Sequence, residues 1–156
     1  MALFLVRHGA CLPGEIDPER RLSREGIAQV ECVAAHAQDR GVLVEAIVHS
    51  PALRARQTSE IMASHLKPGR DAMEAAGLDT LNDVQPFARS IEGKRNLMVV
   101  GHRPFLERLC AYLVTGSPDR VVVQFRVGTM VCLEKGLDGH SWVISWTLTP
   151  DICRPS

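Results

Sequence analysis

The segment ALFLVRHG, residues 2–9, contains five apolar side chains followed directly by an arginine, a histidine and a glycine. A short continuous apolar run with polar residues at its end is typical of a β-strand that is buried on both faces. We therefore predict a strand over residues 2–6, with Arg7 and His8 at its carboxyl end. Ser23 then suits the N-cap of a helix and Gly41 suits its end, because these residue types favour those positions.

The same succession of strand and helix occurs twice more along the chain. Residues 45–49 (EAIVH) form a second short strand pattern before a helix that opens at Ser50-Pro51. Residues 96–102 (NLMVVGH) form a third, before a helix that opens at Pro104. Strands that alternate with helices at this spacing predict an α/β fold, a three-layer α/β/α sandwich with a largely parallel central sheet. Ligands of such folds bind beyond the carboxyl ends of the strands.

The last third of the chain is predicted to complete the sheet. Residues 120–134 and 141–149 have strand character and are joined by a glycine-rich turn at residues 136–139. On the second of these strands the alternating large side chains are expected on one face: Trp142, Ile144, Trp146 and Leu148. The stretch of residues 67–94 is less regular, and there we expect only a short helix around Pro86.

Composition limits the class of protein. At 156 residues the chain fits one compact domain, which we expect to span residues 1–156. Its 18 Lys and Arg balance 18 Asp and Glu, so we expect no binding to nucleic acid and none to anionic membranes. No apolar run approaches the length of a membrane span, and the five cysteines form no C-x-x-C pair. We therefore expect free thiols and a cytoplasmic location.

The residues at the three predicted strand ends share a chemical character. Arg7-His8-Gly9, the segment from Ser50 to Arg54, and Gly101-His102 should meet at one edge of a parallel sheet. Two arginines and two histidines in one cleft repel one another unless an anion neutralises them. A phosphoryl group is the natural anion, since arginine donates two hydrogen bonds to phosphate and the helix opening near Pro51 adds free backbone N–H groups.

The sequence contains no motif for a metal ion or a cofactor. It has no H-E-x-x-H pair, no paired aspartates of the kind that hold magnesium, and no Walker-type glycine loop. We therefore expect a site that uses no metal and no cofactor, with fixed side-chain cations in the place of a metal ion.

Three segments also match the motifs of a known family. LVRHG at residues 5–9, HSPALRARQT at residues 49–58 and MVVGHRP at residues 98–104 resemble the histidine phosphatase superfamily, which has the phosphoglycerate mutase-like fold. The segments RRLSREG (20–26) and WVISWTLTP (142–150) are most similar to the SixA branch of phosphohistidine phosphatases. The resemblance therefore implies both a fold and a type of reaction.

The resemblance also implies a role for each site residue. His8 would attack phosphorus and form a covalent phosphohistidine intermediate. The groups that would bind the transferred phosphoryl group are Arg7, Gly9, Arg54 and His102. Because an unprotonated imidazole nitrogen is the nucleophile, we expect the other ring nitrogen of His8 to donate to a fixed acceptor such as a backbone carbonyl. We also expect the arginines to lower the pKa of His8, and a protonated His102 to stabilise charge on the phosphoryl oxygens.

The proton donor for the leaving group is open at this stage. Many members of the superfamily use a Glu or Asp from an inserted loop, and the candidates here are Glu74, Asp79 and Asp83. All three could equally be solvated loop acids, because their spacing selects none of them. Cys11 and Arg103 adjoin site residues in the sequence, but a packed cysteine and the start of a helix explain them as well.

Three functions fit these residues. The first is a metal-independent phosphatase that removes phosphate from phosphohistidine on a partner protein. This partner would be a phosphotransfer domain or a phosphocarrier, docked on residues 13–20 and 74–83. The second is a phosphatase of small phosphate esters such as sugar phosphates, which a closing lid or extra cationic residues would favour. The third is a catalytically idle phosphate-binding adaptor, whereas a phosphoglycerate mutase would require larger insertions than the chain contains.

Overall fold

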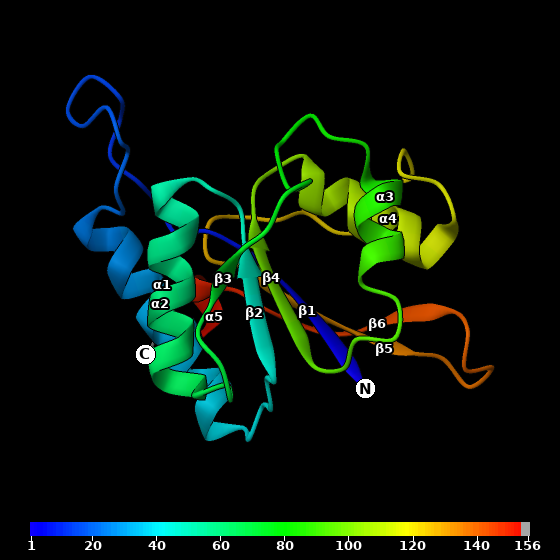
Figure 1. Cartoon of the computed structure of the whole chain (residues 1–156). Helices are drawn as coiled ribbons and strands as arrows, with labels where there is room; N and C mark the ends of the chain where they lie inside the picture. Colours follow the sequence, from blue (N-terminus) through cyan, green and yellow to red (C-terminus); the bar gives the residue numbers. More distant parts are fainter. Residues whose placement is uncertain (154–156) are drawn as a thin grey trace.

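The computed structural model describes residues 1–153, which form six strands and five helices around one sheet (Figure 1). The strands are β1 (Ala2–Arg7), β2 (Ala46–His49), β3 (Met73–Glu74), β4 (Leu97–Gly101), β5 (Met130–Lys135) and β6 (Trp142–Leu148). The helices are α1 (Arg24–Asp39), α2 (Leu53–Leu66), α3 (Val84–Ser90), α4 (Phe105–Thr115) and α5 (Pro150–Cys153). No helix within residues 1–153 is both long and apolar enough to cross a membrane.

The strands are ordered β3-β2-β4-β1-β5-β6 across the sheet. β3, β2, β4 and β1 pair in parallel, while β5 runs antiparallel to both β1 and β6. Five of these six strands therefore point in one direction, and the prediction of a largely parallel sheet is confirmed. β1 and β4 lie at the centre of the sheet, and both are buried almost throughout, as their continuous apolar runs predicted.

Helices cover both faces of the sheet. α1 and α2 lie on one face, and α3 and α4 lie on the other (Figure 1). Successive side chains of β1 point to opposite faces, so Phe4 and Val6 join the core beneath α1 while Leu3 and Leu5 join the core beneath α4. Each face thus has its own apolar core, in agreement with the predicted three-layer α/β/α sandwich.

Helix ends agree with the capping residues seen in the sequence. The Ser23 hydroxyl accepts a hydrogen bond from the Gly26 amide, 3.0 Å away, and caps α1. Gly41, expected at the end of this helix, follows the C-cap residue Arg40 and lies in the left-handed region at φ 73°, where glycine avoids the steric cost of a Cβ atom. The short helix expected around Pro86 is α3, and the carboxylate of its N-cap residue, Asp83, accepts a backbone hydrogen bond.

The strand predicted over residues 120–134 is wrong in its first part. Residues 120–129 form no strand, and β5 begins only at Met130. This loop crosses the carboxyl end of β1, where the Phe125 carbonyl accepts from the Arg7 guanidinium at 2.9 Å. Gly128, at φ 75°, turns the chain there and donates from its amide to the Arg7 carbonyl at 3.1 Å. Hydrogen bonds to Arg7 hold this segment at the end of β1. A pattern of apolar residues along the chain cannot indicate such bonds.

The prediction that the large side chains of β6 share one face is also wrong. Pairing between β5 and β6 is irregular at Ser145, which is an extra residue in the register. Such a β-bulge moves the following side chains to the opposite face of the strand. Trp146 consequently packs near Phe4, with ring centroids 6.1 Å apart, whereas Trp142 and Ile144 pack against the core on the other side of the sheet.

A close backbone contact joins α1 to the loop after β1. A Cβ atom on Gly26 would lie 1.9 Å from the Ala10 carbonyl oxygen, and one on Gly9 would lie 2.7 Å from the Gly26 carbonyl oxygen. Both distances are far below van der Waals contact, so the close approach requires glycine at these two positions. The contact holds the segment that carries His8 against α1.

Replacement of Gly26 by alanine tests this contact. In an exposed helix interior, Gly→Ala adds about 0.5–1 kcal/mol of stability. Here we expect the opposite sign, a loss of at least about 2 kcal/mol in the free energy of unfolding, because the added methyl group overlaps a backbone oxygen. Urea denaturation measures the difference. Gly69→Ala is the matched control, since its Cβ atom would meet nothing within 4 Å. An unchanged or higher stability of Gly26→Ala would contradict the packing.

Candidate active site

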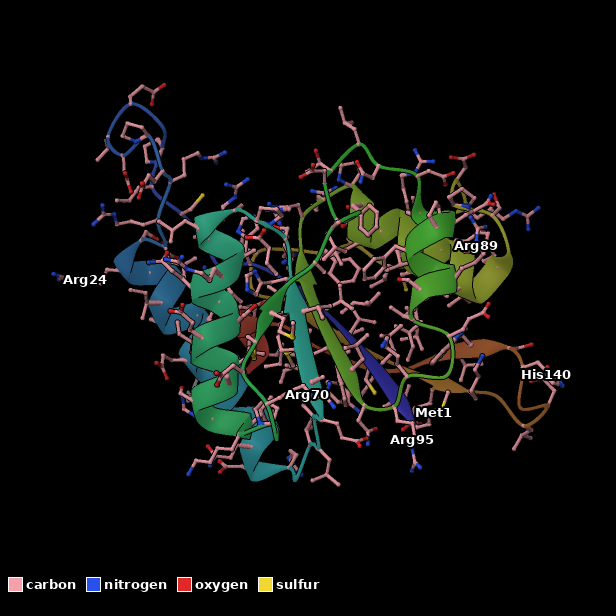
Figure 2. The ribbon with its side chains drawn as sticks, in the orientation of Figure 1. Met1, Arg24, Arg70, Arg89, Arg95 and His140 are labelled. Atoms are coloured by element: carbon pink, nitrogen blue, oxygen red, sulfur yellow. The ribbon has the colours of Figure 1, made fainter. Side chains whose placement is uncertain are left out.

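A cavity of about 470 Å³ opens at the carboxyl edge of the sheet. Its lining residues are Arg7, His8, Ala10, Cys11, Arg20, Arg54, Thr80, His102, Arg103 and Val127. None of these ten residues is acidic, and residues 1–153 contain no group of three or more His, Cys, Asp or Glu that could hold a metal ion. The loops of residues 8–23 and 75–83 rise above this edge (Figure 1), while Met1 and Arg95 mark the opposite edge in Figure 2.

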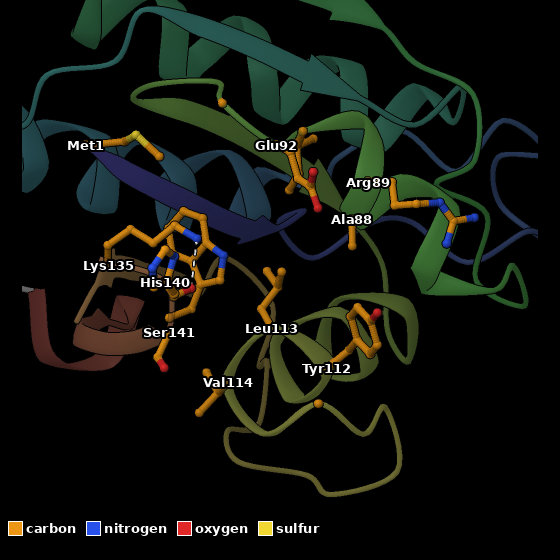
Figure 3. A pocket seen from close by; sticks show the side chains of 14 residues that line it. Met1, Ala88, Arg89, Glu92, Tyr112, Leu113, Val114, Lys135, His140 and Ser141 are labelled. Atoms are coloured by element: carbon orange, nitrogen blue, oxygen red, sulfur yellow. Dashed lines mark hydrogen bonds between the residues drawn. The ribbon is translucent and has the colours of Figure 1, made fainter. Parts of the chain in front are cut away.

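A larger cavity, of about 590 Å³, lies away from these residues (Figure 3). It opens between the carboxyl ends of α3 and α4 and the turn between β5 and β6, beside Met1. There Lys135 Nζ donates to the His140 carbonyl at 3.0 Å and lies 4.3 Å from the centroid of the Trp142 ring. None of the residues predicted to carry chemistry lines this cavity, so size alone does not identify the active site.

His8 lies directly after β1 and is almost fully buried, with 6% of its surface exposed. Its Nδ1 lies 2.7 Å from the Gly9 carbonyl oxygen, which can only accept a hydrogen bond. Nδ1 therefore carries the ring proton and Nε2 has a free lone pair, which is the form that a nucleophile requires. The expected backbone acceptor for His8 is thus confirmed.

The pKa of His8 is lowered to about 3, so its ring is neutral near pH 7. Burial is the largest cause, because removal of the ring from water disfavours its charged form. The charges of His102, Arg54 and Arg7 lower the pKa further, while the hydrogen bond to Gly9 raises it. The prediction that the arginines lower this pKa is therefore confirmed in sign, but burial contributes more.

Gly9 does not fit its expected role in binding the substrate. Its amide donates to Thr58 Oγ1 at 3.2 Å, so this N–H group is not free for a phosphoryl oxygen. Gly9 is also absent from the residues that line the cavity. Its carbonyl group instead orients His8, and its lack of a side chain permits the close contact with α1.

Arg7 and Arg54 bring two guanidinium groups to the cavity, as predicted. Arg7 is the last residue of β1, and its Nη1 donates to the Phe125 carbonyl. Arg54 lies in the first turn of α2, whose N-cap residue, Ala52, makes no side-chain cap bond. Backbone N–H groups at that helix end are therefore available to an anion. Burial is the main reason that the pKa values of both arginines are lowered, although arginine stays charged at neutral pH.

His102 follows β4, and its ring centroid lies 5.0 Å from that of His8. Its Nε2 lies 2.6 Å from Ser50 Oγ, and its Nδ1 is buried without a partner in residues 1–153. Burial, followed by the charge of Arg54, lowers the pKa of His102 to about 4. Without a bound anion His102 is therefore neutral near pH 7, whereas a bound anion would favour the protonated ring, and a protonated His102 beside the phosphoryl group stays a prediction.

Two of the residues that line this cavity carry buried polar atoms without hydrogen-bond partners. Within residues 1–153, four buried side-chain atoms make no hydrogen bond: Arg7 Nε, His102 Nδ1, Thr129 Oγ1 and Arg108 Nε. The first two belong to residues that line the cavity, and the Thr129 carbonyl accepts from the Arg7 amide at 3.0 Å. An unpaired buried polar atom costs about 1–3 kcal/mol, so the oxygen atoms of an anion bound here would reduce this cost.

The structure adds two arginines to the cavity. Arg20 reaches it from the loop before α1, and its Nη2 lies 3.4 Å from Cys11 Sγ. Arg103 also lines the cavity, although its Nε donates to Glu107 Oε1 at 2.6 Å. The sequence placed residue 20 only in the docking rim of residues 13–20 and not in the cavity, because a position in an irregular loop gives no direction for a side chain. The RRLSREG segment, which contains this residue, was the one signal that could have indicated it.

Of the three candidate proton donors, Asp79 is the one whose charge acts on a site residue, although it does not itself line the cavity. Its charge acts on His102 and favours the protonated ring, and its neighbour Thr80 lines the cavity. The two other candidates have different surroundings. Asp83 is engaged as the N-cap of α3, and Glu74 lies in β3.

The burial of the two histidines leads to a prediction about pH. The folded protein holds the pKa of His8 near 3 and that of His102 near 4, below the ordinary value of 6.5. As the pH falls, the unfolded chain therefore takes up protons first, and the free energy of unfolding should decrease between about pH 6.5 and 4. We expect His8→Asn to lose less stability than the wild type over this interval, as measured by urea denaturation at each pH. An equal loss in both proteins would show that His8 does not titrate in this way.

Comparison with known proteins agrees with this site. Residues 3–86, more than half of the chain, match the histidine phosphatase superfamily (branch 1). This range includes Arg7, His8 and Arg54. Phosphohistidine phosphatase SixA of Escherichia coli K12 is 26% identical over 151 residues, which cover 93% of this chain and 94% of SixA.

Two solved structures have the same fold. The protein histidine phosphatase SixA complexed with tungstate has a TM-score of 0.86 at 24% identity and covers 99% of this chain and 100% of that one. Phosphoserine phosphatase from Entamoeba histolytica, in complex with 3-phosphoglyceric acid, has a TM-score of 0.69 at 14% identity and covers 95% and 96%. The fold is accordingly the phosphoglycerate mutase-like one that the sequence motifs implied. On the evidence of its sequence match, the chain belongs to the histidine phosphatase superfamily, and within that superfamily it is similar to SixA.

Proposed function

We propose that this chain is a phosphatase that forms a covalent phosphohistidine on His8 and takes its phosphoryl group from a phosphohistidine on a partner protein. Membership of the superfamily and similarity to SixA support phosphatase activity. The observation that carries the mechanism is the state of His8. Its ring is neutral, Nδ1–H is bound to the Gly9 carbonyl, and Nε2 is unprotonated in a cavity lined by four arginines and no acidic residue.

The reaction would proceed in two phosphoryl transfers. In the first, His8 Nε2 attacks phosphorus while the bond between phosphorus and the substrate nitrogen breaks. The leaving nitrogen keeps the electron pair and gains a proton, for which Asp79 is the candidate donor. In the second, water attacks phosphorus and gives a proton to the Asp79 carboxylate, the bond to His8 Nε2 breaks with its electron pair left on Nε2, and inorganic phosphate leaves. Both transfers occur without any change in oxidation state.

Electrostatic stabilisation is the main contribution that the cavity would make. In phosphoryl transfer, negative charge is spread over the three equatorial oxygens of the transition state. The guanidinium groups of Arg7 and Arg54 are held in place before the reaction, so they stabilise this charge without reorganising solvent. The repulsion between these cations decreases when a phosphoryl group lies between them. The negative charge of that group then favours the protonated form of His102.

The rim of the cavity supports a protein substrate. Ile16, in the loop before α1, exposes 71% of its surface, and Leu81, in the loop after β3, exposes 91%. Apolar side chains that a partner removes from water add to the affinity for that partner. Because the two loops rise above the same edge of the sheet (Figure 1), Ile16 and Leu81 could contact a protein whose phosphohistidine enters the cavity.

Small phosphate esters are a second candidate class of substrate. Arg20 and Arg103 add two cations to those at the three strand ends, and they could bind a second acidic group on a small molecule. Extra cations of this kind are the feature expected of a phosphatase for small esters. The relative turnover of a protein and a small substrate separates the two classes.

Release of phosphate tests the mechanism. With excess chelator present, we expect the wild type to hydrolyse a phosphohistidine-bearing protein and p-nitrophenyl phosphate, because fixed cations would take the place of a metal ion. His8→Ala lacks the nucleophile and should lose at least about 10³-fold in kcat on both substrates. Arg54→Ala should lower kcat/KM by about 10²- to 10³-fold. Arg56→Ala is the matched control, since Arg56 lies outside the cavity and pairs with Glu60.

Each outcome of this experiment has a separate meaning. A higher kcat/KM for the phosphohistidine protein supports the first function, and a higher value for small esters supports the second. Activity that survives in His8→Ala, or that requires a metal ion, contradicts the mechanism. Binding of phosphate without turnover of either substrate would instead indicate a phosphate-binding adaptor.

Charge introduced on the rim tests the protein substrate. In Ile16→Glu and Leu81→Glu we expect kcat/KM for the phosphohistidine protein to fall about 5- to 30-fold, since each loses the burial of one apolar side chain. Turnover of p-nitrophenyl phosphate should stay within about twofold of the wild type, because neither side chain lines the cavity. Leu43→Glu is the control, because Leu43 is 74% exposed but precedes β2 at the opposite edge of the sheet. Equal losses on both substrates would argue against docking at the rim.

A further inference from the structure

Ser50 and His102 meet at the ends of two neighbouring parallel strands. Ser50 follows β2 directly, and its amide donates to the Val100 carbonyl of β4 at 3.2 Å. Its side chain is fully buried, and Oγ lies 2.6 Å from His102 Nε2. The other ring nitrogen of His102, Nδ1, has no partner within residues 1–153. Within residues 1–153, the bond to Ser50 is therefore the one hydrogen bond that the His102 ring makes.

The two histidines of the cavity are thus held by different kinds of group. A carbonyl oxygen only accepts, so the Gly9 carbonyl fixes His8 in a single protonation state. A hydroxyl both donates and accepts, so Ser50 can donate to Nε2 when His102 is neutral and accept from Nε2–H when it is charged. A nucleophile needs the first arrangement, and a group whose charge changes as an anion binds needs the second.

We propose that Ser50 is a positioning residue for His102. Its hydroxyl fixes the plane of the imidazole ring at the cavity and keeps a hydrogen bond to that ring in both of its charge states. The inference rests on the proposed function, in which His102 binds the transferred phosphoryl group. Without this hydroxyl, both ring nitrogens would lack a partner among the described residues, and the ring could turn about its Cβ–Cγ bond.

Removal of the hydroxyl tests the role of Ser50. In Ser50→Ala we expect kcat/KM and the affinity for tungstate, measured by calorimetry, to fall about 10- to 100-fold, the loss of one hydrogen bond to a charged group. Ser50→Cys keeps a weaker donor and acceptor of similar size. Its kcat/KM and tungstate affinity should lie between those of the wild type and those of Ser50→Ala. Ser59→Ala is the matched control, because Ser59 is equally buried but donates to Ala55 within α2. We expect its tungstate affinity to equal that of the wild type.

A double-mutant cycle separates positioning from a general structural role. If Ser50 acts through His102, then Ser50→Ala should change tungstate affinity less than about twofold in a His102→Asn background. In the tungstate complex of the wild type, the His102 ring should also titrate at higher pH than in Ser50→Ala, as followed by ¹⁵N NMR. The hydroxyl bonds the ring in both charge states, but its hydrogen bond with the charged ring is the stronger one. If Ser50→Ala acted only through a structural defect elsewhere, its effect on tungstate affinity would persist in the His102→Asn background. The pH at which His102 titrates would then not fall.

Three results would overturn the inference. One is wild-type affinity and turnover in Ser50→Ala. Another is a loss that adds in full to that of His102→Asn, which would show that Ser50 acts on another group. The third is a wild type that binds no tungstate, which would overturn the proposed function and the inference with it. If the wild type binds tungstate but one of the first two results is found, only the inference about Ser50 is overturned, and the proposed function is unaffected.

Discussion

The parallel pairing of β1 with β4 and of β4 with β2 is the constraint on which the site depends. Val6 and His49 both lie opposite Val100 in the two registers, so the residues that follow each strand leave the sheet at the same edge. His8, Ser50 and His102 are distant in the chain, yet each occupies the first positions after its strand. The apolar cores on both faces stabilise this pairing, and the cavity exists where the paired strands end.

Like charges gathered at one edge of a sheet limit what the site can be. Four arginines line the cavity, and burial makes additional positive charge there unfavourable. His8 and His102 accordingly have lowered pKa values, with burial as the first cause in both. The same property that keeps His8 neutral makes it a potential nucleophile, while the surrounding cations make the cavity selective for anions. The neutral nucleophile and the anion site thus both result from burial and from the arginines gathered at this edge of the sheet.

The predictable parts of the fold are those that local chemistry determines. A strand buried on both faces needs a continuous apolar run, and β1 and β4 were predicted for that reason. Ser23 and Gly41 marked the two ends of α1 because their hydrogen bonds and dihedral angles are local. Residues 120–129 were predicted wrongly, since their path depends on bonds to Arg7. The faces of β6 were also wrong, since the bulge at Ser145 exists only in the pairing with β5.

By itself, the sequence determined the α/β class, the superfamily and four of the residues that line the cavity: Arg7, His8, Arg54 and His102. Patterns of polarity and short motifs carry this information because they describe neighbours along the chain. The tertiary structure alone decided that Gly9 orients His8, that Arg20 reaches the cavity, and that both histidines are neutral. These properties depend on burial and on hydrogen bonds between residues far apart in the sequence, and such contacts form only when the strands pair.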